Sequence, residues 1–258
     1  MNEERRYLSP VEKELLFDKW AKTQNVKMFL FDLDDTLCPT AWIFRQQMSV
    51  ASEYLTQKLG LSSGSELRKE MQELNDGLFN INGVNPKRWD KFIITLTGRY
   101  QIPKDSQNEL TKMFGQIYTT PLEIYPDAEK TLFFLQKVGM PIGIVTHANK
   151  DWTWEKYNWL GLSRFVDYSD VFVVNENGHK TADAWRQALG YFKTDPKNVA
   201  IVGDSPRSDI NPGKEIGVKH LFLSRKGDIW SLHDQPVGAN TIVIQDLTEI
   251  MEVGRSVL

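Results

Sequence analysis

Short apolar runs alternate with longer amphipathic segments along the second half of the chain. The apolar runs, rich in Val, Ile and Phe, are 142–146, 171–174, 199–203, 220–223 and 241–244. The segments of helical length that separate or follow them are 128–138, 152–160, 182–192 and 247–253. Short buried strands that alternate with helices are typical of parallel β-α-β units. The pattern therefore predicts an α/β fold built on a parallel sheet.

The first part of the chain contributes one more strand and one separate helix. The sequence Ser9-Pro10-Val11-Glu12 has the form of a capping box with proline at the first helical position, so we expect a helix over about residues 10–22. Residues 27–32, which include the apolar run 28–31, have the length of a strand. This strand must join the same sheet, because a single parallel strand has no hydrogen-bonding partner of its own.

A helical pattern without strand signals fills the region between this first strand and the others. The expected helices are 43–57, 65–76, 88–99 and 106–117. A polar, Asn- and Gly-rich stretch at 77–86 is predicted to be a loop. We therefore divide the chain into an α/β core made of residues 1–38 and 120–258, and an inserted helical domain made of residues 39–119.

Composition and charge narrow the functional classes. The net charge of −3 and the pI of about 5.9 do not favour binding to nucleic acid or to an anionic membrane, which require a basic surface. The sequence has no apolar run near the roughly 20 residues of a membrane span, and its first six residues do not resemble a secretory signal. The single cysteine, Cys38, fits a reducing compartment. We expect a cytoplasmic protein.

The end of the first strand carries the strongest chemical signal. Asp32-Leu33-Asp34-Asp35-Thr36 directly follows the apolar run 28–31. Residues i and i+2 of an extended chain point the same way, so Asp32 and Asp34 would lie together at the carboxyl end of a buried strand. Two close carboxylates repel each other unless a proton or a cation compensates. A nucleophile, a general acid and a magnesium site are each consistent with that arrangement.

Polar residues also follow the other predicted strands. Thr146 ends the second strand, Asp204 and Asp209 follow the strand at 199–203, and Lys180 precedes a predicted helix. Ligands of an open parallel sheet bind beyond the carboxyl ends of its strands. We therefore expect these side chains to meet Asp32 and Asp34 in one crevice.

This ordered set of motifs resembles the haloacid dehalogenase (HAD) superfamily. The first motif, D-x-D-x-T, is matched at Asp32, the second at Thr146, the third at Lys180, and the acidic G-D-x(3,4)-D loop at Gly203 to Asp209. The resemblance covers about residues 27–245 and implies a Rossmann-like core with a helical C1-type cap. Two positions depart from the usual pattern, since histidine follows Thr146 and threonine follows Lys180.

The resemblance implies a role for each motif. Asp32 would attack phosphorus and form an aspartyl-phosphate, and Asp34 would act as general acid and then general base. Thr146 would hold phosphate oxygens, and Lys180 would supply a positive charge near Asp32. Lys180 has a weak local signature, and Lys150 and Lys156 are competing candidates for its role. The expected catalytic residues are those of the four motifs: Asp32, Asp34, Thr146 and Lys180.

The same resemblance implies a bound divalent cation, Mg²⁺, held by carboxylate oxygens. Asp32, the backbone carbonyl of Asp34 and Asp204 are the expected ligands. Asp209 is expected to act behind them or through a water molecule. These four residues make up the predicted metal site.

Substrate contacts are expected on two sides of the crevice. His147, Ala148 and Asn149, which follow the second motif, would face the phosphate. The loop 77–88 of the insertion, which includes Arg88, would recognise the leaving group, and its amides and cations suit either a polyol or a second anionic group. Sugar phosphates, phosphoglycolate and nucleoside monophosphates are all compatible, and the oligomeric state stays open.

Other chemistries fit the sequence poorly. The six residues between Cys38 and Arg45 do not match the C-x(5)-R pattern of cysteine phosphatases, and the four histidines lack zinc-ligand spacing. By resemblance, Asp34 excludes dehalogenases, which have no acid/base carboxylate at that position, and P-type ATPases, which carry threonine. The sequence thus predicts a Mg²⁺-dependent phosphatase of a small phosphorylated metabolite. The alternatives are a phosphomutase of the same superfamily or a noncatalytic HAD-like interaction module.

Overall fold

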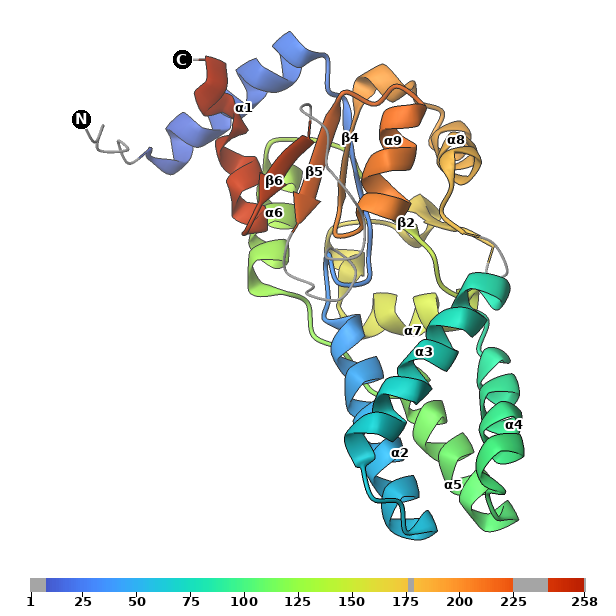
Figure 1. The fold of residues 1–258 in the computed structure, drawn as a ribbon. Coiled ribbons are helices and arrows are strands. Elements are labelled where there is room, and N and C mark those ends of the chain that lie inside the picture. The colour runs from blue at the N-terminus through green and yellow to red at the C-terminus, as the bar shows by residue number, and fades with distance from the viewer. Residues whose placement is uncertain (1–7, 176–178, 225–240, 258) are drawn as a thin grey trace, which may run out of the picture.

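A computed structural model describes residues 8–175, 179–224 and 241–257 of the chain (Figure 1). The six residues inspected for a secretory signal lie outside this part. Among the described residues six strands pair in parallel in the order β3-β2-β1-β4-β5-β6. The strands are β1 (Met28–Phe31), β2 (Ile142–Thr146), β3 (Val171–Val173), β4 (Val199–Gly203), β5 (His220–Ser224) and β6 (Thr241–Ile244). The predicted parallel α/β sheet is confirmed.

β1 lies at the centre of the sheet and fixes the place of the site. Phe31, at its end, is paired with Ile144 of β2 on one side and with Val202 of β4 on the other. The strand order reverses its direction at β1, because the chain goes first to β2 and β3 and later to β4, β5 and β6. Such a reversal opens a crevice at the carboxyl ends of the strands. The residues that follow β1 and β4 therefore meet there.

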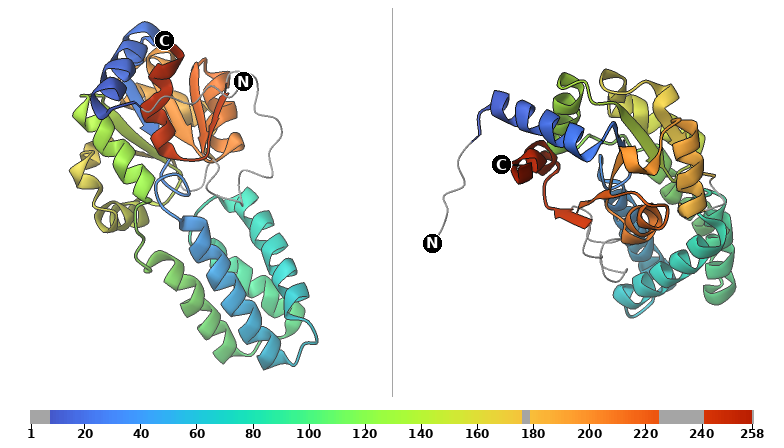
Figure 2. Two further views of the ribbon diagram at one scale, coloured as in Figure 1. Left: turned by 90° about the vertical axis from the view of Figure 1, so that its left-hand side faces the viewer. Right: turned by 90° about the horizontal axis from the view of Figure 1, so that it is seen from above.

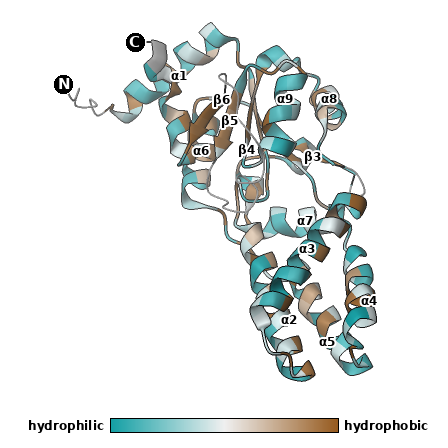
Figure 3. Cartoon of the chain, in the orientation of Figure 1, coloured by the Kyte–Doolittle hydropathy of each residue, from teal (hydrophilic) through white to brown (hydrophobic). Residues whose placement is uncertain are grey.

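Alternating side chains of the strands enter two separate hydrophobic clusters, as the pleat of a sheet requires. Phe29 and Phe31 belong to one cluster, and Leu30, between them, belongs to the other. The first cluster is covered by the helices α1 (Pro10–Gln24), α6 (Pro126–Lys137) and η6 (Leu247–Val257), and the second by α8 (Ala182–Tyr191) and α9 (Asn211–Glu215). Figure 3 shows the hydrophobic colouring of the strands in contrast with the mixed colouring of the helices.

The N-terminal helix α1 packs against η6 at the other end of the chain (Figure 2). Its predicted capping box is present, with Ser9 and Glu12 each bonded to the other's backbone N–H. Lys13 pairs with Glu252 at 2.7 Å. The two helices cross closely at Gly254, where a Cβ atom would lie 2.3 Å from the backbone of Leu16. The helix is thus tied to the core through the C-terminal segment.

Four helices between β1 and β2 form a bundle that extends from the carboxyl edge of the sheet (Figure 1). They are α2 (Thr40–Leu59), α3 (Gly64–Asn82), α4 (Arg88–Tyr100) and α5 (Lys104–Gly115). The helix α7 (Lys150–Trp159) lies between this bundle and the sheet, and its Trp152 contacts Phe44 and Tyr118 at ring-centroid distances of 6.0 and 5.0 Å. Helix α7 thus contacts the inserted region through aromatic side chains.

The prediction of a loop at 77–86 is wrong for most of these residues. Helix α3 continues to Asn82, and only residues 83–87 connect it to α4. Leu78 packs against the hydrophobic core, and Asn82 donates a hydrogen bond to the carbonyl of Leu78 at 2.9 Å. These contacts outweigh the low helix propensity of Gly77, which costs only about 1 kcal/mol relative to alanine.

Two smaller differences concern the end of the chain. The short helix α9 follows a π-helical turn at Pro206–Ile210, and neither was predicted. The predicted last helix is observed as the 3₁₀ helix η6. No helix in the described ranges combines the length and the apolar character that crossing a membrane requires.

Candidate active site

A cavity of about 660 Å³ lies between the carboxyl edge of the sheet and the helical bundle. The core contributes most of the charged side chains of its wall, and the bundle contributes aromatic, amide, aliphatic and charged side chains. The core residues include Asp32, Asp34, Lys180, Asp204 and Asp209, and the bundle residues include Phe44, Asn75, Phe79 and Arg88. The volume is within the range of sites for small molecules, about 300–1,000 Å³.

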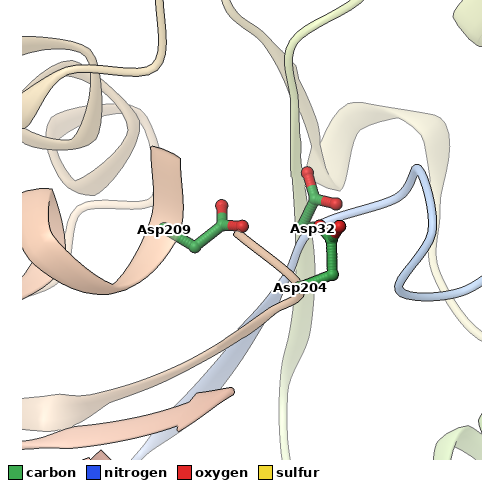
Figure 4. Close-up of side chains that lie close together, drawn as sticks. All are labelled: Asp32, Asp204 and Asp209. Carbon is green, nitrogen blue, oxygen red and sulfur yellow. The ribbon is translucent and has the colours of Figure 1, made fainter. Parts of the chain in front are cut away.

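Three buried carboxylates meet at the floor of this cavity (Figure 4). Asp32 follows β1, Asp204 follows β4, and Asp209 lies in the π-helical turn, and one oxygen of each lies within 4.8 Å of the others. Burial, partly offset by the charge of Lys180, raises the pKa of Asp32 to about 7. Burial and the neighbouring Asp32 raise the pKa of Asp204 well above its ordinary value. The cluster therefore requires a compensating positive charge.

Lys180 supplies one such charge. Its ammonium forms an ion pair with Asp32 and lies 2.5 Å from Oδ1 of Asp209. Burial alone would lower the pKa of Lys180, but these two carboxylates outweigh it and raise the pKa. Thr181 caps the helix that follows, so the lysine is held at the start of α8. Among the competing candidates, Lys150 is exposed on α7.

Close packing against Asp209 requires glycine at position 203. A Cβ atom at position 203 would lie 2.3 Å from Cγ of Asp209. Asp209 also accepts a hydrogen bond from the backbone N–H of Ser205 at 3.2 Å. A side chain at position 203 would therefore displace Asp209 from Lys180.

The carboxylate cluster fits a hard divalent cation. Oδ2 of Asp204 is buried and has no hydrogen-bond partner among the described residues. A buried carboxylate oxygen without a partner is costly, and a cation would compensate for it. Asp209 has one oxygen near Lys180 and the other near Ser205, which suits a supporting position. Asp32 and Asp204 are thus the carboxylates best placed to bind such an ion directly.

Asp34 has a different environment from Asp32. Its Oδ1 accepts a hydrogen bond from Thr40 at 2.6 Å and lies 2.5 Å from the ammonium of Lys156. The sequence indicates Lys156 only as an alternative to Lys180, and the sequence analysis does not predict its pairing with Asp34. One signal was present in the sequence, because Lys156 falls four residues after Trp152, on the buried face of α7.

Of the four residues from Thr146 to Asn149, which were expected to face the phosphate, only some are positioned to do so. Thr146 ends β2, and its Oγ1 is buried without a hydrogen-bond partner among the described residues. His147 lines the cavity, whereas Ala148 and Asn149 do not. Ala148 is buried, and the side chain of Asn149 caps α7 by accepting from the backbone N–H of Trp152. The structure thus brings His147, but not Thr146, Ala148 or Asn149, to the cavity wall.

The bundle reaches the core through the end of α3. Phe79 contacts both His147 and His179, at ring-centroid distances of 6.1 and 5.7 Å, and the two histidine rings contact each other at 5.8 Å. Asn80 and Arg88 also line the cavity. Three other residues of the expected recognition loop are not in the cavity wall: Asn82, Asn85 and Lys87. This part of the cavity wall is therefore made by the end of α3, by Val84 of the connecting segment and by the start of α4.

Comparison with known proteins identifies the family. The family model of a haloacid dehalogenase-like hydrolase matches residues 26–217. This range includes all four motifs, from Asp32 to Asp209.

Curated relatives and solved structures agree with this match. The chain is 26% identical to a glyceraldehyde 3-phosphate phosphatase of Methanocaldococcus jannaschii, with 88% of this chain and 97% of the relative covered. It is 24% identical to a phosphoglycolate phosphatase of Neisseria meningitidis, with 90% and 95% covered. A haloacid dehalogenase-like hydrolase from Xanthomonas campestris has the same fold, with a TM-score of 0.72, 16% identity and coverage of 90% and 91%.

Proposed function

The chain belongs to the haloacid dehalogenase-like hydrolase family, and we propose that it is a Mg²⁺-dependent phosphatase that hydrolyses a small phosphorylated metabolite through an aspartyl-phosphate. One observation carries this proposal. Asp32 and Asp34 line the same cavity, but Asp32 belongs to the buried carboxylate cluster and Asp34 is held separately by Lys156 and Thr40. Two carboxylates in two environments suit two chemical roles.

In the first step Asp32 is the nucleophile. One of its carboxylate oxygens forms a bond to phosphorus, and the bond from phosphorus to the ester oxygen breaks. Lys180 neutralises part of the negative charge near Asp32, and Thr36 holds Oδ2 of Asp32 by a hydrogen bond of 3.2 Å. Asp32 is largely buried but lines the cavity, so a substrate in the cavity can reach it.

Asp34 transfers the protons. It gives a proton to the leaving ester oxygen, so the product leaves as an alcohol, and then takes a proton from the water that attacks the aspartyl-phosphate. The bond between Asp32 and phosphorus breaks in this second step, and inorganic phosphate is released. The hydrogen bonds from Lys156 and Thr40 fix one oxygen of Asp34, so the carboxyl group has a defined orientation.

Asp32, Asp204 and the backbone carbonyl of Asp34 would hold Mg²⁺, with Asp209 in support. When bound, the ion would neutralise the charge of the carboxylates and of the phosphate oxygens. The buried, unpartnered oxygen of Asp204 supports this assignment. Asp209 keeps Lys180 in place on the other side of Asp32.

The size and position of the cavity favour a small substrate. The bundle covers the crevice, and the cavity of about 660 Å³ suits a metabolite rather than a polymer. We take residues 39–119 as the cap of the site, and the bundle residues that line the cavity support this assignment. The named relatives act on glyceraldehyde 3-phosphate and phosphoglycolate, which are both of this size class.

The test is release of inorganic phosphate from 4-nitrophenyl phosphate and from a panel of phosphorylated metabolites. Activity should vanish in excess chelator, return with Mg²⁺ and return poorly with Ca²⁺, which is larger and less strictly octahedral. Asp32→Asn should abolish turnover without lowering the thermal transition, because it removes one of the repelling charges. Transfer of phosphate to a second hydroxyl without its release would indicate a phosphomutase instead. Full activity in chelator, or in Asp32→Asn, would refute the proposal.

A further inference from the structure

Arg88 is a buried cation on the wall of the cavity. It is the first residue of α4, and only 4% of its surface is exposed. Its guanidinium donates one hydrogen bond, at 3.3 Å, to the carbonyl of Gly83, and its Nε is buried without a hydrogen-bond partner. Within residues 8–175, 179–224 and 241–257, no acidic side chain forms an ion pair with it.

Aromatic rings surround this guanidinium but compensate its charge only in part. Its Cζ atom lies 4.8 Å from the ring centroid of Trp89, 5.4 Å from that of Phe44 and 5.9 Å from that of Phe79. A cation–π contact contributes about 0.5–2 kcal/mol, whereas burying an ion costs several kcal/mol. Burial accordingly lowers the pKa of Arg88. The part of this burial cost that the aromatic rings do not offset favours the binding of an anion at Arg88.

Asp76, an acidic residue of the same cavity wall, does not compensate the charge of Arg88. Asp76 lines the cavity, but it accepts hydrogen bonds from Gln72 at 2.8 Å and from Asn75 at 3.4 Å. The other arginines in the cavity wall, Arg45 and Arg207, are exposed to solvent. Arg88 is therefore set apart from them by burial.

We propose that Arg88 binds a second anionic group, carried by the leaving-group part of the substrate. This inference rests on the proposed phosphatase function, because the phosphate that reacts is assigned to Asp32 at the floor of the cavity. A guanidinium binds carboxylate and phosphate with two parallel hydrogen bonds, so either group fits. Phosphoglycolate carries a carboxylate of this kind, whereas glyceraldehyde 3-phosphate has an uncharged aldehyde. Arg88 thus favours a phosphorylated acid or a bisphosphate over an uncharged sugar phosphate.

Matched substrate pairs test the inference. Phosphoglycolate and 2-hydroxyethyl phosphate differ only in the carboxylate, as do 3-phosphoglycerate and glycerol 3-phosphate. Fructose 1,6-bisphosphate and fructose 6-phosphate test a second phosphate in the same way. For at least one type of pair, the wild-type kcat/KM should favour the anionic member by about tenfold or more, mainly through KM. The type of pair that shows the preference identifies the anion.

Variants then assign the preference to Arg88. Arg88→Met keeps the apolar stem in the aromatic surroundings and should bring the ratio within each preferred pair close to one. Arg88→Lys should recover part of the ratio, because it restores charge without the bidentate geometry. Arg45→Met, at an exposed arginine in the same cavity, is the matched control and should keep the wild-type ratio.

The outcomes separate this inference from the proposed function. A wild-type enzyme that hydrolyses both members of every pair equally well would overturn the role of Arg88 and leave the phosphatase intact. Equal loss on both members in Arg88→Met and Arg88→Lys would also overturn it. Absence of phosphate release from every substrate with Mg²⁺ would instead contradict the proposed function. If Arg88→Met does not fold, the wild-type ratios and Arg88→Lys still decide.

Discussion

Lys156 and Asp34 form an ion pair across 122 residues of sequence, with the ammonium 2.5 Å from Oδ1. The lysine side chain is fully buried, whereas 22% of the Asp34 side chain is exposed. The ammonium also lies 3.9 Å from the ring centroid of Trp152. Because Thr40 donates to the same oxygen, two donors fix one side of the carboxylate. Both hydrogen bonds go to Oδ1, so we expect Oδ2 to face the substrate.

Replacement of Lys156 should disturb proton transfer more than phosphoryl transfer to Asp32. In Lys156→Met the aliphatic stem remains and the charge is lost, so Asp34 can turn away from the leaving group. We expect about a tenfold lower kcat/KM for alkyl phosphates, which need a proton on the leaving oxygen, and a smaller effect on 4-nitrophenyl phosphate. Steady-state kinetics with both classes measures the difference. A uniform loss would assign Lys156 a structural role only.

Asp34→Asn should show the same selectivity more strongly. The amide cannot donate and recover a proton as a carboxyl group does, so alkyl phosphates should lose about 10²–10⁴-fold in kcat. Aryl phosphates should lose less in the first step, and a phosphorylated enzyme should accumulate because water is no longer deprotonated. Burst kinetics and mass measurement of the trapped protein check this. Equal losses for both classes without accumulation would argue against proton transfer by Asp34.

The metal-free protein should lose stability as the pH rises. Burial raises the pKa of Asp32 from its ordinary 3.8 to about 7, so between these values the folded chain keeps a proton that the unfolded chain has released. The free energy of unfolding therefore falls with pH across this window and levels off above it. Melting temperatures in chelator should decrease by several degrees from pH 4.5 to pH 7.5.

Three controls accompany that measurement. Asp32→Asn should flatten the decrease, although Asp204, whose pKa is also raised by burial, will keep part of it. Asp183→Asn, at a carboxylate with 81% side-chain exposure, should leave the profile unchanged. Added Mg²⁺ should raise the melting temperature most at high pH, where the carboxylates are ionised. A melting temperature that rises with pH in chelator would contradict the assignment.

Gly203→Ala should damage the site through Asp209. The new methyl group would lie 2.3 Å from Cγ of Asp209, and overpacking of this kind costs about 1–3 kcal/mol. Displacement of Asp209 would release Lys180 from one partner, so activity should fall by about tenfold or more. Gly190→Ala is the matched control, because its Cβ would meet no atom within 4 Å. Wild-type activity in Gly203→Ala would show that activity does not depend on the observed position of Asp209.

The sequence by itself determined the sheet and the acidic floor of the site. The strands were predicted within about one residue of their observed ends, because strands that are buried on both faces have short, continuous apolar sequences. The positions of Asp32 and Asp204 followed from a general rule, since all carboxyl ends of a parallel sheet meet at one edge, whereas Lys180 was assigned by resemblance to the family. Such information is local, and a single sequence carries it.

The tertiary structure alone decided the contacts that depend on packing between distant segments. Helix α3 continues through Gly77 because Leu78 meets the core, although local propensity favours a loop there. Lys156 pairs with Asp34 because α7 lies under the sheet edge, and Arg88 is buried because aromatic rings of the bundle close around it. A charge becomes costly or useful only through its surroundings, and those surroundings exist only after the chain has folded.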